Sequence, residues 1–133
     1  MTITVITQRD GSLRQQATVR EFSALTVDAP REVGGDESAP DPHDYFDLSL
    51  GACKAMTALM YARRKHLPVE AITATVERDA SEEARGHYRL TVTLAFEGIN
   101  DPETLNRLLE IADRCPIQRL MTVSDVDITT RPA

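Results

Sequence analysis

The sequence predicts a single α+β domain in which antiparallel strands pack with a long central helix. Residues 2–7 alternate apolar and polar side chains, as a half-buried strand does, and residues 88–96 alternate in the same way. Between them, residues 42–65 form a segment of helical length whose apolar side chains leave little polar surface. A chain of 133 residues has the size of one domain, and we expect residues 1–133 to form it.

The N-terminal part predicts a three-stranded meander. Residues 2–7, 13–19 and 23–27 indicate the strands, and Arg9-Asp10-Gly11 supplies a turn after the first of them. The segment 30–40 is rich in proline, glycine and acidic residues and is expected to be a loop. Loops of this length are often functional, but a linker or a disordered segment fits the composition too.

The central helix has a clear start signal. Asp41 is a candidate N-cap, Pro42 suits the first helical position and Asp44 is placed to complete a capping box. Pro68 stops the helix after about Lys65. Apolar side chains leave little polar surface, which predicts a nearly buried helix: Tyr45, Phe46, Leu48, Leu50, Ala52, Met56, Leu59 and Met60.

The C-terminal half adds two strands, a second helix and a last strand. Residues 69–77 and 88–96 alternate around the polar turn 79–86. Asp101 caps the second helix and Pro116 ends it. The apolar seam of that helix is formed by Leu105, Leu108, Ala112 and Cys115. Val126 and Ile128 alternate in a final strand, so the predicted order is β-β-β-α-β-β-α-β.

Composition excludes several classes of function. The net charge of −6 and the pI near 5.0 argue against nucleic-acid binding, which needs a basic face. No segment reaches the length of about 20 apolar residues that a membrane span requires. The N-terminus lacks a signal-peptide pattern, so we expect a cytoplasmic protein in a reducing compartment. The three histidines and two cysteines have no metal-site spacing, and we expect neither metal nor bound cofactor.

The two cysteines, Cys53 and Cys115, are the candidate functional residues. Each lies in an apolar helical context, and two interpretations stay open: inert packing or a buried redox couple. Cys53 lies too deep in its helix for the N-terminal dipole to lower its pKa. Ser49 and Thr57 share its face, where each could donate a hydrogen bond to a thiolate or bond back to the helix backbone. No CxxC motif is present.

Three segments resemble the OsmC/Ohr family, the osmotically inducible and organic hydroperoxide resistance proteins. Residues 30–35 are similar to the loop ahead of the family's central helix. Residues 41–53 resemble its proline-acidic-leucine helix start, followed by Leu-Gly-Ala-Cys. Residues 107–117 resemble its second cysteine helix, which Cys-Pro closes. The order of the predicted elements agrees as well, so the resemblance covers nearly the whole chain.

The resemblance implies an intertwined homodimer with active sites at the subunit interface, and a thiol peroxidase activity. Cys53 would attack the peroxide O–O bond, leaving an alcohol or water and a sulfenic acid. Cys115 would condense with the sulfenic acid to a disulfide, which an external dithiol reduces. An apolar pocket beside Met56 and Met60 would favour organic hydroperoxides. The alternative is a dimer that binds a small apolar ligand at its interface, with structural or redox-sensing cysteines.

The chain departs from the family pattern around the first cysteine. Peroxidases of the family pair an arginine with a glutamate that follows the first proline of the helix; here His43 and then Asp44 follow that proline. Asp44 either replaces the glutamate or serves only the capping box. Lys54 follows Cys53 where small polar residues are common, and its side chain is expected to point away from the face of Cys53. The candidate arginines are Arg9, Arg14, Arg20 and Arg31.

Overall fold

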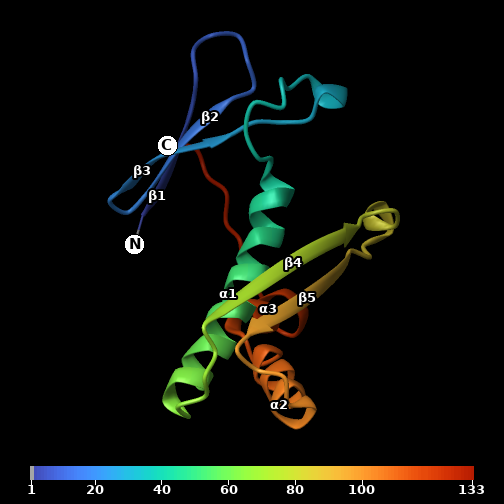
Figure 1. Ribbon diagram of the computed structural model, residues 1–133. Coiled ribbons are helices and arrows are strands. Elements are labelled where there is room, and N and C mark those ends of the chain that lie inside the picture. The colour runs from blue at the N-terminus through green and yellow to red at the C-terminus, as the bar shows by residue number, and fades with distance from the viewer. Residues whose placement is uncertain (1) are drawn as a thin grey trace. The chain divides into compact units, whose positions relative to one another are not determined.

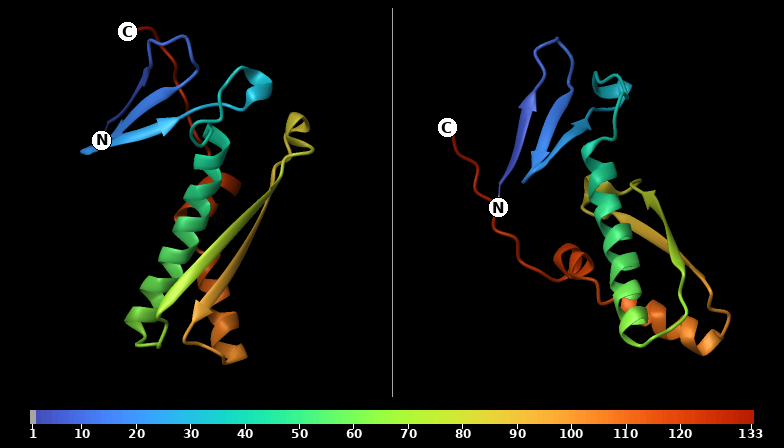
Figure 2. Two further views of the ribbon diagram at one scale, coloured as in Figure 1. Left: turned by 45° about the horizontal axis from the view of Figure 1, so that its top comes forward. Right: turned by 60° about the vertical axis from the view of Figure 1, so that its left-hand side comes forward.

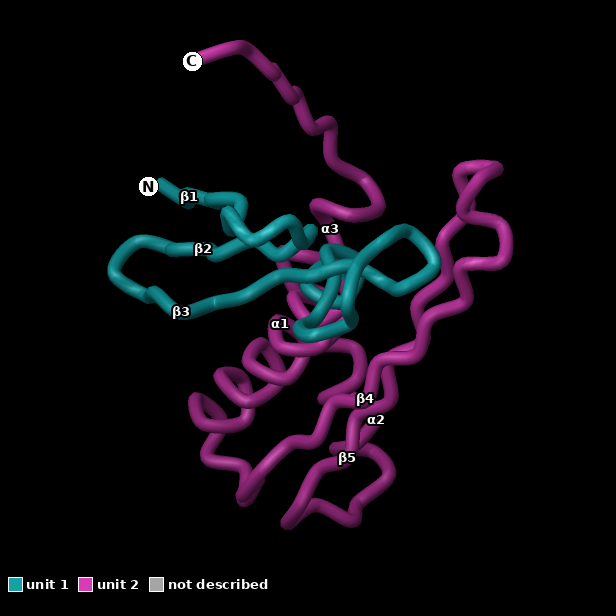
Figure 3. The backbone as a smooth tube through the Cα atoms, turned by 90° about the horizontal axis from the view of Figure 1, so that it is seen from above, with its two compact units in different colours: residues 1–46 teal, residues 47–133 magenta. Residues whose placement is uncertain are grey.

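The structure is a computed structural model that describes residues 2–133 (Figure 1). Its elements are β1 (Ile3–Thr7), β2 (Gln15–Val19), β3 (Phe22–Val27), η1 (Arg31–Val33), α1 (Pro42–Arg64), β4 (Ala71–Asp79), η2 (Glu83–Arg85), β5 (Arg89–Glu97), α2 (Pro102–Ala112) and α3 (Pro116–Thr122). Antiparallel strands with helices confirm the α+β class. The chain divides into two compact units, unit 1 up to Phe46 and unit 2 from Asp47 (Figure 3).

Unit 1 is built on the predicted three-stranded meander. Strand β2 lies between β1 and β3 and pairs antiparallel with both, so that Ala17 faces Val5 on one side and Leu25 on the other. Ala17 is buried, whereas the larger apolar side chains of the outer strands are exposed. Strand pairing therefore holds this sheet together more than side-chain burial within the chain does.

The loop between β3 and α1 is closed by a buried carboxylate. Asp28 accepts hydrogen bonds from the backbone N–H and hydroxyl of Ser38, at 3.0 and 2.5 Å, and its own N–H donates to the carbonyl of Pro40 at 3.2 Å. The bonds from Ser38 lower the pKa of Asp28 to about 2. Gly35 lies so close to Ala29 that a Cβ would be 2.0 Å from the Ala29 carbonyl oxygen. The predicted loop is thus a folded segment of fixed shape.

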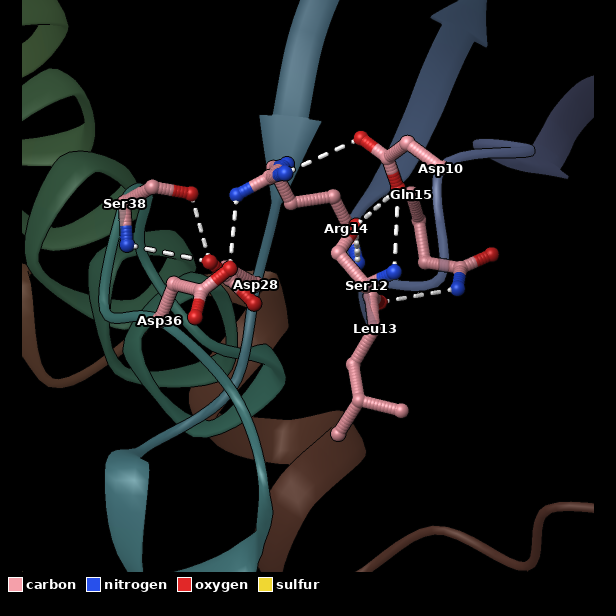
Figure 4. Close-up of polar contacts among 8 residues, drawn as sticks. All are labelled: Asp10, Ser12, Leu13, Arg14, Gln15, Asp28, Asp36 and Ser38. Carbon is pink, nitrogen blue, oxygen red and sulfur yellow. Dashed lines mark hydrogen bonds and ion pairs between the residues drawn. The ribbon is translucent and has the colours of Figure 1, made fainter.

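Arg14 ties the β1–β2 turn to this loop (Figure 4). Its guanidinium donates to Asp10 at 2.9 Å and to Asp36, in the loop, at 2.8 Å. Ser12 donates to Asp10 from both its backbone and its hydroxyl. These bonds, those from Ser12 first, hold the pKa of Asp10 well below its usual range.

Helix α1 begins with the predicted capping box. The Asp41 N–H donates to the Asp44 carboxylate at 2.9 Å, and the Asp44 N–H donates to the Asp41 carboxylate at 2.8 Å. Tyr45 adds a hydroxyl bond to the carbonyl of Thr26 at 2.8 Å. The structural role of Asp44 is therefore confirmed.

Unit 2 packs one face of α1 on the β4–β5 hairpin (Figures 1 and 2). The two strands pair antiparallel over their whole length. Gly51 marks the close approach, because a Cβ there would lie 2.7 Å from the Val76 methyl carbon. Ala62, Ile99 and Leu108 form a buried cluster from α1, the loop after β5, and α2. Tyr61, Leu67, Val69, Phe96 and Leu105 pack around this cluster.

A buried carboxylate also links α1 to the hairpin. Asp47 accepts hydrogen bonds from the Arg78 Nε at 2.6 Å and the Tyr88 hydroxyl at 2.7 Å. Desolvation, together with the negative charge of Asp47, raises the pKa of Tyr88 to about 12. The neutral tyrosine hydroxyl is therefore retained as a donor to the carboxylate well above neutral pH.

The prediction of a nearly buried central helix was wrong for the single chain. One face of α1 is buried, formed by Asp47, Leu50, Gly51, Lys54, Ala58 and Ala62. Other apolar side chains that the sequence assigned to the interior are exposed: Phe46, Leu48, Met56 and Met60. The reason is geometric, since only one face of this helix meets the elements of unit 2.

The C-terminal prediction needs two corrections. Helix α2 ends at Ala112 rather than at Pro116, and Pro116 instead begins α3, because proline suits the first position of a helix. Cys115 therefore caps α3 and does not continue the seam of α2. Residues 123–133 form no strand, although Val126 and Ile128 alternate. A strand needs a hydrogen-bonding neighbour, and none is paired with this segment.

Gly35→Ala tests the fixed shape of the loop. The added methyl group must displace the Ala29 backbone, so we expect a loss of more than about 2 kcal/mol in the free energy of unfolding. Gly11→Ala is the matched control: its φ of +80° is strained, but no atom lies within 4 Å of the new Cβ. The control is expected to cost about 1 kcal/mol. Equal losses in urea unfolding would contradict the close packing at Gly35.

Candidate redox site

The first cysteine lies in the middle of a helix that supports it on both sides. Cys53 is on α1, one residue before the buried Lys54, and is half-buried with a free thiol. Its helix is held by the capping box at the start and by the hairpin contact at Gly51. The backbone that carries this thiol is thus held at two points, and in the single chain the Cys53 side chain is partly exposed to solvent.

The second cysteine lies where α2 passes into α3. Cys115 is 0% exposed and its thiol is free. Its Sγ accepts a hydrogen bond from the backbone N–H of Gln118 at 3.3 Å, and its own N–H donates to the carbonyl of Ala112 at 3.2 Å. The short turn between the two helices therefore fixes the sulfur in the interior of unit 2.

The structure brings the two cysteines close together. Lys54, the residue after Cys53, donates hydrogen bonds to Asp113 and Gln118, which lie on either side of Cys115. Burial raises the pKa of the Cys115 thiol, and the neighbouring Cys53 raises it further. The Gln118 N–H and the ammonium of Lys54 act in the opposite direction. Two cysteines that lie near each other in a fold are candidates for a disulfide.

Lys54 is the residue that sequence analysis missed. It is only 7% exposed, and its ammonium donates to the Asp113 carboxylate at 2.9 Å and to the Gln118 side-chain oxygen. The sequence indicated that Lys54 points away from the face of Cys53. The sequence did not indicate that the Lys54 side chain reaches Asp113 and Gln118, the residues on either side of Cys115. A lysine on the buried face of a helix needs a partner, and that signal was available.

Three of the four candidate arginines have other neighbours within unit 1. Arg14 pairs with two carboxylates, Arg31 pairs with Glu37 at 3.0 Å, and Arg20 stacks over the Phe22 ring. Cys53 belongs to unit 2. The activation of the thiol by one of these arginines stays a prediction. So do the replacement of the family glutamate by His43 or Asp44 and the roles of Ser49 and Thr57.

Two features are absent from residues 2–133. No group of three or more histidine, cysteine, aspartate or glutamate side chains is arranged there to hold a metal ion. None of the helices in the same range is long and apolar enough to cross a membrane.

This is an α+β fold in which one thiol lies in the middle of a long helix and the second lies nearby, where α2 passes into α3. The model of one family, the OsmC-like proteins, matches residues 34–131. The chain therefore belongs to the OsmC family. No curated protein matches it in sequence.

Solved structures of this family share the fold. A Psychrobacter arcticus protein, proposed to act in osmotic stress and detoxification, has a TM-score of 0.73 and 23% identity, over 90% of this chain and 87% of that one. An organic hydroperoxide resistance protein of Legionella pneumophila has a TM-score of 0.62 and 23% identity, over 92% of this chain and 90% of that one. OhrB of Bacillus subtilis, also an organic hydroperoxide resistance protein, has a TM-score of 0.61 and 17% identity, over 92% of this chain and 90% of that one. At these identities the likeness establishes the fold.

The exposure of the two thiols predicts their order of alkylation. Iodoacetamide at mildly alkaline pH is expected to modify Cys53 at least about tenfold faster than Cys115, because the second thiol is buried and its pKa is raised, so less thiolate is present. Peptide mass spectrometry of the quenched reaction measures both rates. In denaturant the two rates should become equal; a faster Cys115 in the native protein would contradict the assignment.

Proposed function

We propose that the protein is a thiol-dependent hydroperoxide reductase that uses Cys53 and Cys115 in turn. The Cys53 thiolate attacks the peroxide oxygen, the O–O bond breaks, and the leaving alkoxide takes up a proton to become an alcohol. Cys53 is then a sulfenic acid. The Cys115 thiol attacks its sulfur, and the hydroxyl group leaves as water with the thiol proton. An external dithiol reduces the resulting disulfide, so no bound cofactor is needed.

The proximity of the two cysteine segments is the observation that carries this proposal: Lys54, next to Cys53, bonds to Asp113 and Gln118 on either side of Cys115. A sulfenic acid without a neighbouring thiol is open to further oxidation, whereas a thiol close by can intercept it. The unequal burial of the pair supports the division of roles. Cys53, the more accessible thiol, meets the peroxide; Cys115, completely buried, is protected from direct oxidation and reacts with Cys53.

Organic hydroperoxides are the proposed substrate class. Met56 and Met60 follow Cys53 on α1 by about one and two turns, and both are 61% exposed. An apolar group bound beside them would bury their side chains, a gain that hydrogen peroxide does not offer. The Legionella and Bacillus proteins, both named for organic hydroperoxide resistance, support the same class.

A second copy of the chain is the proposed partner. Large apolar side chains stand exposed on several elements of the single chain: Ile3, Val5, Ile6, Phe22, Phe46, Leu48, Met56, Met60, Leu120 and Val123. Soluble monomers rarely expose so many, and an intertwined homodimer would cover them. The two free thiols are compatible with the reducing cytoplasm, which is the proposed location.

Cumene hydroperoxide tests the chemistry directly. Wild-type protein treated with one equivalent should lose the mass of two hydrogens, localised to a Cys53–Cys115 disulfide by peptide mass spectrometry. Cys53→Ser should abolish peroxide turnover, because it removes the nucleophile. Cys115→Ser should undergo the first oxidation but not recycle, so that Cys53 proceeds to sulfinic acid.

Two results would count against this assignment. Equal residual turnover in both variants would remove the separate roles of the two cysteines. Oxygen added at methionines, with both thiols untouched, would leave the fold without the peroxidase activity. The second result would favour the alternative function, a dimer that binds a small apolar ligand around Met56 and Met60.

Dilution tests the proposed homodimer. If the exposed apolar residues are covered only in the dimer, an approximately hundredfold dilution should lower the apparent melting temperature and release no stably folded monomer. Sedimentation velocity and circular dichroism over the same concentrations measure both properties. A folded monomer with an unchanged melting temperature would contradict the proposal.

A further inference from the structure

Lys54 combines a buried charge with a position next to the first thiol. The chain has two lysines, and the other, Lys65, is exposed. Removing an ammonium group from water costs free energy that one ion pair rarely recovers in full. Its partner Asp113 is largely solvated, with a side chain 70% exposed. Net stabilisation is therefore a poor explanation for placing a lysine here.

The contacts of Lys54 lie on both sides of the second thiol. Asp113 precedes Cys115 by two residues and Gln118 follows it by three, and the Lys54 ammonium donates to both side chains. Gln118 also donates its backbone N–H to the Cys115 sulfur at 3.3 Å. The Lys54 side chain, next to Cys53 in the sequence, thus holds the segment that carries Cys115.

We propose that Lys54 is a positioning residue that keeps the Cys115 sulfur against the Cys53 sulfur and so promotes closure of the disulfide. Its role in turnover rests on the proposed peroxidase function, whereas its role in pairing the thiols does not. In the closing step the S–S bond forms, the S–O bond of the sulfenic acid breaks, and water leaves with the Cys115 proton. Lys54 exchanges no proton; it fixes the geometry and places a positive charge near the attacking sulfur.

The positive charge of Lys54 also promotes disulfide closure, in addition to its positioning role. The attacking form of Cys115 is the thiolate, and burial disfavours it. The Lys54 ammonium opposes that effect of burial on the pKa of Cys115. The Lys54 ammonium is held by Asp113 and Gln118, beside Cys115, so the first oxidation at Cys53 is expected to be independent of Lys54.

Three variants separate positioning from general stability. Lys54→Met keeps the length of the side chain and removes the charge; Lys54→Arg keeps the charge; Lys65→Met is the matched control at the exposed lysine. Each protein is equilibrated with mixtures of reduced and oxidised dithiothreitol, and the fraction of Cys53–Cys115 disulfide is measured by mass spectrometry. We expect Lys54→Met to lower the equilibrium constant for the disulfide about tenfold, Lys54→Arg to recover part of it, and Lys65→Met to leave it unchanged.

A kinetic measurement tests the closing step itself. Cumene hydroperoxide is added in the presence of dimedone, which traps sulfenic acids. Lys54→Met should consume peroxide in its first turnover at the wild-type rate but accumulate several times more dimedone adduct at Cys53, because closure is slow. An equal slowing of both steps would indicate a structural role only and would overturn the proposal.

The remaining outcomes also decide between the proposals. A disulfide constant for Lys54→Met equal to that of the wild type overturns the positioning role. A wild type that does not react with peroxide refutes the proposed function, yet the dithiothreitol equilibrium still tests the positioning. If Lys54→Met does not fold, Asp113→Ala takes its place, because that side chain is exposed and its removal takes away one hydrogen-bond acceptor of Lys54. A wild-type disulfide constant in Asp113→Ala would then overturn the proposal.

Discussion

Unit 2 depends on the close approach of helix α1 to strand β4 at Gly51. A side chain at that position would overlap the Val76 methyl group, so only glycine lets the helix lie this near the hairpin. With the helix in place, Asp47 reaches Arg78 and Tyr88 on the strands. On the same face, one turn beyond Gly51, Lys54 reaches the segment of Cys115. The packing of one glycine thus determines where two buried charges find their partners.

The two thiols of the pair lie on different kinds of structural element. Cys53 belongs to a long helix that is capped at its start. Cys115 belongs to a short turn between α2 and α3, which depends on hydrogen bonds from Gln118 and to Ala112. The helix and the turn hold the two thiols near each other, as a reaction between two sulfurs requires. Cys115 is also the completely buried member of the pair, which limits its reactions to its neighbour.

Local signals in the sequence were sufficient for most of the elements. The capping residues Asp41, Asp44 and Asp101 act within three residues of themselves, and the structure contains the bonds they predict. The end of α2 was misplaced because proline either stops a helix or begins one, and the sequence does not distinguish the two. The last strand was wrong because alternation does not supply a pairing neighbour. The partners of Lys54 lie about 60 residues away, and only the tertiary fold brings them together.

Two acid groups, Asp28 in unit 1 and Tyr88 in unit 2, lose their contributions to stability at opposite ends of the pH scale. Asp28 has a pKa of about 2 in the folded protein against 3.8 ordinarily, so its contribution to unit 1 is complete above pH 4 and is lost as the pH falls through 2. Tyr88 has a pKa of about 12 against 10.0, so its contribution to unit 2 is complete below pH 10 and is lost as the pH rises through 12. Acid therefore loosens the loop ahead of the central helix first. Alkali instead weakens the contact between that helix and the hairpin, and with it the support of the two thiols.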